Sequence, residues 1–277
     1  MGRIADKAKS LMPKCLRKLF QQKWNHWRRW RYGSRGTPAK LCGESFRFKF
    51  GYEPAPDIPG KFWEEDRLFM KVFYETIEEG QTVVDVGAFV GHYTMLAARK
   101  VGPNGRVISF EPSPASWRIL INNLVLNDLL DRVDVWPMAA GRSDGFAQIY
   151  FQTHDPVRGH NSMSCLPFEQ RGLTESLISQ PVPCVALGPF LDSLGLRPDV
   201  IKIDIEGPEI EVLQSLVFIL QTPALIFCEL HPQLWIEPER QFNNLQLLLD
   251  RTGRIAETLG GQPLFVLQHE PVILRKK

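Results

Sequence analysis

Short apolar runs alternate with longer amphipathic segments through most of the chain after residue 80. Runs of five or six residues rich in Val, Ile and Phe are nearly continuous in apolar character, as is typical of parallel strands covered on both faces. This pattern predicts strands at residues 82–86, 106–110, 132–136, 200–204 and 224–229. Helix-length segments separate most of them, and helix starts are predicted at Ser113-Pro114 and after Gly207-Pro208. We therefore predict an α/β fold with a doubly wound, mostly parallel sheet.

Two further segments modify this scheme. Residues 254–258 and 264–268, separated by Gly260-Gly261, predict an antiparallel pair that closes the sheet. An irregular stretch at residues 146–187 contains extra strand candidates at 146–151 and 182–187. Long insertions at the top of such a sheet commonly form substrate lids, so a lid is one interpretation of this stretch.

The first 40 residues differ from the rest in charge. They hold 12 Lys and Arg against one acidic residue, a net charge of +11, whereas residues 41–277 carry −9. Apolar positions at helical spacing and three Trp residues make this a basic amphipathic segment. It can dock on the rest of the chain, contact an anionic membrane through residues 1–32, or bind nucleic acid. We regard nucleic acid as the least favoured of the three.

These features predict a division into three parts. Residues 1–45 form the basic segment, residues 46–79 a Gly- and Pro-rich linker with a leading helix near 63–78, and residues 80–277 the main domain. The apolar content of 44% indicates a globular protein. Five cysteines without a CxxC pair suggest neither a disulfide framework nor a zinc site, and no apolar run approaches 18 residues. We expect a cytoplasmic protein, with peripheral membrane contact as an option.

The most informative motif follows the first predicted strand. Residues 85–91 read D-x-G-x-x-x-G, in which Gly87 allows a sharp turn and close approach of a ligand, and Gly91 allows close contact at the helix start. A dinucleotide site requires G-x-G-x-x-G, but Phe89 stands where the second glycine belongs. NAD is therefore disfavoured.

A second acidic residue, Glu111, ends the next strand 24 residues after Gly87, and Pro112 fixes the turn behind it. A carboxylate there can accept both ribose hydroxyls of an adenosine ligand. Asp85 adds negative charge, which would repel a phosphate but suits a cofactor with an ammonium and a sulfonium group. S-adenosylmethionine has these features. The segment Met138–Gly141 contains small residues, including Ala139, that leave room for an adenine ring.

Four ordered motifs resemble the FkbM family of S-adenosylmethionine-dependent methyltransferases: Val84–Ala88 with Gly91, Ser109–Pro112, Ile201–Gly207 with Glu209, and Cys228–Pro232. The resemblance implies a Rossmann-like class I methyltransferase fold with a seven-stranded sheet and an antiparallel C-terminal strand. It also implies O-methylation of a hydroxyl on a sugar, glycolipid or polyketide-like molecule. Phe89 departs from the family, in which many relatives have Asn.

Carried onto this sequence, the resemblance places the methionine end of the cofactor at the glycine turn, its ribose at Glu111, and its transferring methyl beside Asp204. The full set of predicted cofactor-binding residues is Asp85, Gly87, Ala88, Gly91, Glu111, Pro112, Ala139 and Asp204.

A hydroxyl acceptor needs a base to take its proton. His231 is the first candidate because it follows directly on the fifth predicted strand, and Asp204 is the second. Asp204, Glu206, Glu229 and His231 could alternatively meet as a Mg²⁺ site. We expect no metal, because Glu206 and Glu209 also suit a helix N-terminus and Glu229 a buried cation.

Two other functions remain open. An RNA methyltransferase would use the basic segment to grip phosphate, and a non-catalytic adaptor would keep the fold and use that segment to hold a membrane or a partner protein. The pattern identifies neither the acceptor molecule nor the oligomeric state.

Overall fold

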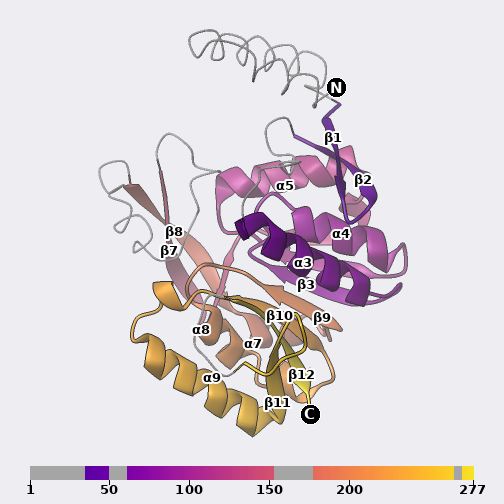
Figure 1. Cartoon of the computed structure of the whole chain (residues 1–277). Helices are drawn as coiled ribbons and strands as arrows, with labels where there is room; N and C mark the ends of the chain where they lie inside the picture. The colour runs from indigo at the N-terminus through magenta and orange to yellow at the C-terminus, as the bar shows by residue number, and fades with distance from the viewer. Residues whose placement is uncertain (1–34, 50–60, 153–176, 265–269) are drawn as a thin grey trace, which may run out of the picture.

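The computed structural model describes residues 35–49, 61–152, 177–264 and 270–277 (Figure 1). Most of the basic N-terminal segment, including residues 1–32, lies outside the described residues, as does the middle of the insertion at 153–176. The interpretations placed on those segments stay predictions.

A seven-stranded sheet forms the centre of the molecule, in the order β11-β12-β10-β9-β3-β4-β5. All neighbouring pairs are parallel except those that involve β12, which runs antiparallel to both β10 and β11. The strands are β3 (Thr82–Val86), β4 (Arg106–Phe110), β5 (Val133–Trp136), β9 (Val200–Ile203), β10 (Leu225–Leu230), β11 (Arg254–Thr258) and β12 (Glu270–Lys276). The predicted doubly wound sheet with an antiparallel C-terminal strand is confirmed.

Helices cover both faces of this sheet because successive strand residues point to opposite sides. Val83, Val107 and Val200 pack with one group of helices, whereas Val84, Ile108 and Ile201 pack with the other. The first group is α3 (Lys61–Thr76), α4 (His92–Val101) and α5 (Pro114–Leu126). The second group is α7 (Leu187–Ser193), α8 (Glu209–Ser215) and α9 (Pro238–Thr252). Short 3-10 turns occur at Leu130–Arg132, Ile219–Gln221 and Pro232–Leu234.

Two predicted helix starts are present. Ser113 caps α5, accepting a hydrogen bond from the backbone N–H of Ser116, and Pro114 is the first helical residue. Helix α8 begins directly after Gly207-Pro208, as its sequence indicated.

Strand β11 pairs with β12, which was not predicted. Of its predicted partner, residues 264–268, only Leu264 is described; its backbone N–H donates to the carbonyl of Ala256 in β11 at 2.9 Å, beside an antiparallel bridge between Glu257 and Pro263. The rest of that predicted pair stays a prediction.

Strand β12 contains Pro271, which cannot donate a backbone hydrogen bond. The register explains why it is tolerated: pairing with β11 begins only at Val272, so Pro271 has β10 alone as its neighbour.

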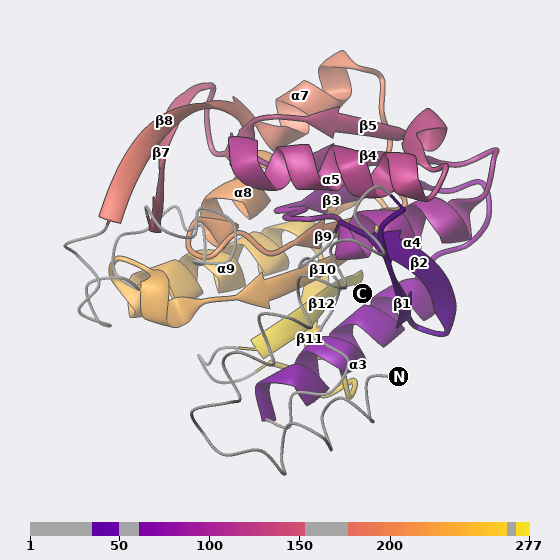
Figure 2. The ribbon, with the colours of Figure 1, turned by 90° about the horizontal axis from the view of Figure 1, so that it is seen from above.

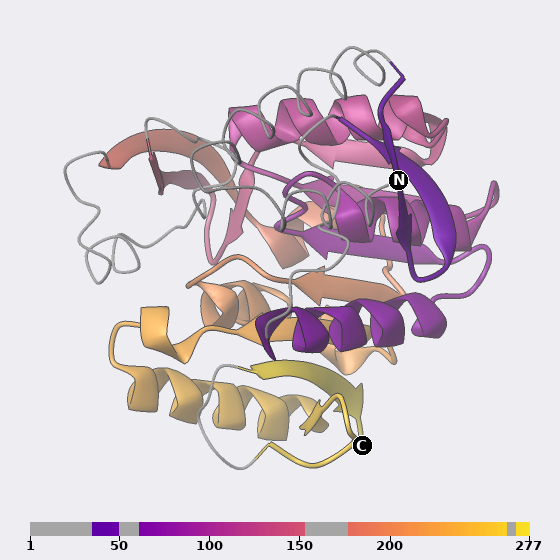
Figure 3. The same ribbon diagram turned by 45° about the horizontal axis from the view of Figure 1, so that its top comes forward.

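The predicted insertion forms part of a second, smaller sheet, with the order β6-β8-β7. Strands β7 (Gly145–Gln152) and β8 (Leu177–Ala186) pair antiparallel over eight residues, and β6 (Ala139–Gly141) pairs with the end of β8. Figures 2 and 3 show that β7 and β8 project from the body as an arm. The extra strands expected in this stretch are present, whereas β6 was not predicted.

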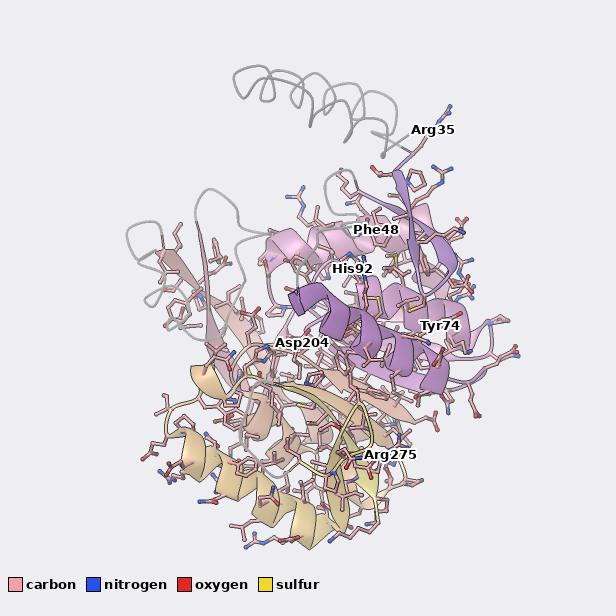
Figure 4. All side chains as sticks on the ribbon, viewed as in Figure 1. Arg35, Phe48, Tyr74, His92, Asp204 and Arg275 are labelled. Atoms are coloured by element: carbon pink, nitrogen blue, oxygen red, sulfur yellow. The ribbon has the colours of Figure 1, made fainter. Side chains whose placement is uncertain are left out.

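A hairpin of β1 (Thr37–Leu41) and β2 (Glu44–Phe48) packs against α5 and the start of α4. The rings of Phe48 and His92, the first residue of α4, lie 5.3 Å apart in an edge-on contact (Figure 4). The side-chain Oδ1 of Asn127, at the C-terminus of α5, accepts a hydrogen bond from the backbone N–H of Arg47 at 2.8 Å. Within the described ranges, no helix has the length and apolar character needed to cross a membrane.

Candidate active site

Acidic and basic side chains gather where four neighbouring strands end. The strands β10, β9, β3 and β4 lie side by side, and all four run in the same direction. The chain leaves β3 toward β4 and β5, then returns to β9 on the other side of β3. Such a switch in strand order opens a crevice outside the carboxyl ends of the strands, where ligands bind in doubly wound sheets.

Gly87 turns the chain at the end of β3. It has a φ of 81°, and a Cβ atom at this position would lie 1.9 Å from the carbonyl oxygen of Asp204. No other residue type fits this close approach of β3 to the end of β9. The backbone N–H groups of Gly87 and Ala88 both donate to the carbonyl of Phe110 at 3.0 Å, which holds the turn against β4.

Gly91 closes the turn and begins α4. Its φ is 96°, and a Cβ would lie 2.4 Å from Leu120 of α5, so the glycine permits the predicted close helix contact. Between the two glycines, Phe89 also adopts a left-handed conformation, with a φ of 51°, and its side chain is 37% exposed. Asn adopts this region more readily than Phe, so this position carries local strain.

Glu111 stands at the end of β4, opposite the turn. Its Oε2 accepts the backbone N–H of Phe89 at 2.7 Å and its Oε1 accepts that of Ser113 at 2.8 Å. Burial raises the pKa of Glu111 to about 8, although these hydrogen bonds and the charge of Lys202 act against the rise. Each carboxylate oxygen has a further lone pair for a ligand hydroxyl.

Asp85 is fully buried rather than open to a ligand. Its Oδ2 accepts the hydroxyl of Thr94 at 2.6 Å. Its Oδ1 makes no hydrogen bond of good geometry, but lies 3.4 Å from the Lys202 ammonium. We therefore expect Asp85 to act on a bound cofactor through Lys202 and the turn.

Lys202 lies at the centre of this group although it belongs to a nearly continuous apolar strand. Its Nζ donates to the carbonyl of Gly87 at 3.0 Å, lies 3.3 Å from Asp204, and stands 4.9 Å from the ring centre of Tyr93. Burial disfavours the charged ammonium, but Asp204 and Asp85 outweigh burial and raise the pKa of Lys202 to about 12. Lys202 thus carries a permanent positive charge. Sequence reasoning gave it no role, although a lysine in an apolar strand is itself a signal of a buried partner.

His231, the predicted base, follows β10 and is 7% exposed. Its Nδ1 lies 2.8 Å from Glu209 of α8, and its Nε2 lies 3.8 Å from Glu229. Burial disfavours the imidazolium, but the hydrogen bond and charge of Glu209, with Asp204 and Glu229, raise the pKa of His231 to about 9. The sequence predicted only a helix-dipole role for Glu209.

The possibility of a metal site can be assessed from distances. Candidate ligand atoms of Asp204, Glu229 and His231 all lie within 4.8 Å of one another, a spacing that a metal ion could bridge, and among the described residues Glu206 is not part of this group. The ammonium of Lys202, however, already faces Asp204. A divalent ion beside it would meet strong repulsion.

The other predicted cofactor residues occupy varied positions. Ala88 is buried within the turn, and Pro112 is half-buried behind Glu111. Ala139 is buried in β6, where it packs with Ile149 and Val182 of the small sheet. No ligand contact tests these three assignments, so they stay predictions.

The fold and the site together define a doubly wound α/β protein with an acidic crevice at its topological switch point. Residues 85–255, more than half of the chain, match the family described as "Methyltransferase FkbM domain". The chain belongs to this family, which confirms the resemblance seen in its motifs.

Curated relatives are also methyltransferases by name. The chain is 28% identical to "Methyltransferase sdnD" of Sordaria araneosa, over 48% of this chain and 59% of that protein. It is 26% identical to "Hexuronic acid methyltransferase AglP" of Haloferax volcanii, over 58% of this chain and 61% of that protein. The chain therefore spans about three fifths of the length of these two relatives.

Solved structures with a similar fold include an S-adenosylmethionine-dependent O-methyltransferase from Thermotoga maritima, at 12% identity and a TM-score of 0.44, covering 86% of this chain and 71% of that one. A second is a 16S rRNA methyltransferase from T. thermophilus, at 16% identity and a TM-score of 0.46, covering 87% and 50%. The strand order and the family match, rather than these distant likenesses, establish the fold.

Proposed function

We propose that this protein is an S-adenosylmethionine-dependent O-methyltransferase that acts on a hydroxyl of a sugar, glycolipid or polyketide-like molecule. The observation that carries the proposal is the Glu111 carboxylate at the end of β4, directly across from the Gly87 turn. Membership of a methyltransferase family supports it. A relative named for hexuronic acid supports a sugar hydroxyl as the acceptor.

The residues at the crevice suit a positively charged adenosine cofactor. Glu111 would accept the ribose hydroxyls, and the turn from Gly87 to Gly91, with Ala88, would lie along the methionine end. Pro112 and Ala139 would border the adenosine, and Asp204 would face the sulfonium. The side chains at these strand ends are mainly carboxylates, with Lys202 and His231 as the cations. Such an excess of negative charge favours a cationic ligand and opposes a pyrophosphate.

When bound, S-adenosylmethionine supplies an electrophilic methyl group. The chain must orient the acceptor oxygen and take its proton. We assign Nε2 of His231 as the base that takes the proton of the acceptor hydroxyl. Asp204, whose side chain is 28% exposed, is the second candidate for this base. Because the pKa of His231 is raised to about 9, the imidazole is protonated at neutral pH and must lose a proton first. Turnover should therefore increase with pH up to about 9.

A methyl-transfer assay tests the proposal. The full chain is incubated with S-adenosylmethionine labelled in its methyl group and, separately, with methyl glycosides of hexuronic acids, neutral hexosides and a short single-stranded RNA. We expect label in a glycoside together with a mass gain of one methylene, and turnover lowered by about 10² or more in His231→Gln. Label in the RNA alone would favour the RNA methyltransferase, and cofactor binding without transfer to any hydroxyl would contradict the proposed activity.

A further inference from the structure

Glu209 is a fully buried carboxylate at the first position of α8. Three donors converge on its two oxygens: the backbone N–H of Gly207 at 2.8 Å, Nδ1 of His231 at 2.8 Å, and the indole N–H of Trp235 at 2.7 Å. A carboxylate is costly to bury, and these hydrogen bonds compensate for the water that it loses. A role at the helix dipole alone would not require burial or three partners.

The contact with Glu209 determines which nitrogen of His231 can react. A carboxylate only accepts, so Nδ1 of His231 carries the hydrogen of this bond. The neutral imidazole then has its lone pair on Nε2, the nitrogen that lies 3.8 Å from Glu229. The carboxylate of Asp204 belongs to the same close group as Glu229 and the imidazole of His231.

The charged groups around His231 come from three elements. Glu209 belongs to α8, Glu229 to β10, and Lys202 to β9, with Asp204 directly after the end of β9. Glu209 lies 2.8 Å from Nδ1 of the imidazole, whereas Glu229 lies 3.8 Å from Nε2. Among these charged groups, Glu209 therefore has the largest individual effect on the charge and orientation of the imidazole.

We propose that Glu209 is a positioning residue for His231: it fixes the imidazole with Nδ1 protonated and Nε2 directed toward the crevice, and it stabilises the imidazolium that forms when Nε2 takes a proton. The catalytic part of this inference rests on the proposed function, in which His231 is the base. The structural part, that Glu209 controls tautomer and protonation, holds without it. The same logic operates wherever a buried carboxylate orients a histidine base.

Nuclear magnetic resonance of the full chain, labelled with ¹⁵N in its histidines, tests the structural part. The His231 signal is identified by its loss in His231→Gln, and long-range ¹⁵N–¹H correlations report its protonation and tautomer as the pH changes. We expect the wild-type ring to titrate with a midpoint near pH 9 and to carry its proton on Nδ1 above that pH. In Glu209→Gln the midpoint should fall and the Nε2–H tautomer should appear.

Glu211→Gln is the matched control. Glu211 lies two residues further along α8, where it accepts a hydrogen bond from Gln241 at 2.9 Å. Its substitution should leave the titration of His231 unchanged. If Glu209→Gln does not fold, Glu209→Asp replaces it, because the shorter side chain keeps the charge but stretches the hydrogen bond, and the midpoint should still fall. An unchanged midpoint and tautomer in the Glu209 variant, or a wild-type midpoint near 6.5, would overturn the inference.

Kinetics test the catalytic part with the glycoside that the transfer assay identifies. Glu209→Gln should lower kcat by about 10² or more, move the pH–rate profile to lower pH, and leave KM for S-adenosylmethionine within about twofold. Glu209→Asp should recover part of the rate. Equal losses in Glu209→Gln and Glu211→Gln would overturn a specific role. A protein that methylates no acceptor contradicts the proposed function, whereas the titration alone decides whether Glu209 controls His231.

Discussion

Lys202 and Asp85 form an ion pair that is almost wholly removed from solvent, with Nζ 3.4 Å from Oδ1 and side-chain exposures of 1% and 0%. The same ammonium donates to the carbonyl of Gly87, so the Lys202 side chain of β9 connects Asp85 to the glycine turn that follows β3. These contacts of Lys202 fix the position of the glycine turn relative to the end of β9. The predicted cofactor site depends on both.

Removal of Lys202 should destabilise the protein strongly. Lys202→Met keeps the apolar stem but leaves Asp85 buried without its cation, which costs about 3–5 kcal/mol in comparable buried pairs. Urea unfolding measures the free energy of unfolding. Asp85→Asn in the same chain should restore part of the loss, because it removes the uncompensated charge.

A surface pair provides the control for this substitution. Lys71 lies 3.8 Å from Glu75, and both side chains are more than 60% exposed. Lys71→Met should change the free energy of unfolding by about 0.5 kcal/mol or less. Similar effects of the two lysine substitutions would contradict the central role of Lys202.

Gly87→Ala should be far more damaging than Gly80→Ala. The two glycines have nearly the same φ, 81° and 83°, so an alanine meets the same backbone strain of about 1–2 kcal/mol at each. At Gly80 nothing lies within 4 Å of the added Cβ, whereas at Gly87 it meets the Asp204 carbonyl at 1.9 Å. Thermal unfolding should show a clearly larger loss for Gly87→Ala. Equal losses in thermal stability would contradict the steric conflict between a Cβ at residue 87 and the Asp204 carbonyl.

Glu111 should make both stability and cofactor affinity depend on pH. Its pKa is raised above the ordinary 4.5 to about 8, so the folded protein holds the proton more tightly than the unfolded chain. Its contribution to stability is complete below about pH 4.5 and is lost as the pH rises through about 8. The ionised carboxylate is the better acceptor for ribose hydroxyls, so affinity for S-adenosylmethionine should increase between pH 7 and 9.

Glu111→Gln isolates this titration, since the amide does not ionise. Thermal unfolding of the cofactor-free variant should show a smaller fall in stability between pH 5 and 8 than the wild type. Its affinity for S-adenosylmethionine should vary less with pH. Parallel curves for the two proteins would show that Glu111 does not titrate in this range.

Divalent ions should not bind at the Asp204, Glu229 and His231 group. The Lys202 ammonium 3.3 Å from Asp204 supplies positive charge there, and its raised pKa keeps it charged. Millimolar Mg²⁺ or Mn²⁺ should leave the unfolding temperature within about 1 °C, because a ligand that binds only the folded state raises it. A concentration-dependent rise that disappears in His231→Gln would establish a metal site instead.

The fold could be predicted largely because its strands are short apolar runs, and because β3, β4 and β9 are followed directly by glycine or an acidic residue. Strands β3 and β4 have the predicted bounds, and Ser113-Pro114 correctly indicated the start of α5. The glycine turn was predictable because Gly87 and Gly91 each serve a local steric need. These features depend on neighbours in the sequence.

The features that escaped prediction depend on contacts between distant segments. Lys202 is explained only by Asp85, 117 residues earlier, and Glu209 only by His231 and Trp235. Strand β12 was not predicted, and its Pro271 is tolerated because of the register that β12 takes with its two neighbours. A buried charge in an apolar run indicates that a partner exists, but the sequence alone does not identify it.

Calorimetric titration of S-adenosylmethionine into the full chain near pH 8 tests the cofactor site most directly, because it requires no knowledge of the acceptor. We predict one site per chain and a loss of about 1–3 kcal/mol in binding free energy for Glu111→Ala. Exposed Glu78→Ala should bind as the wild type does. The absence of binding at millimolar S-adenosylmethionine, or equal affinity of wild type and Glu111→Ala, would contradict the cofactor site described for this crevice.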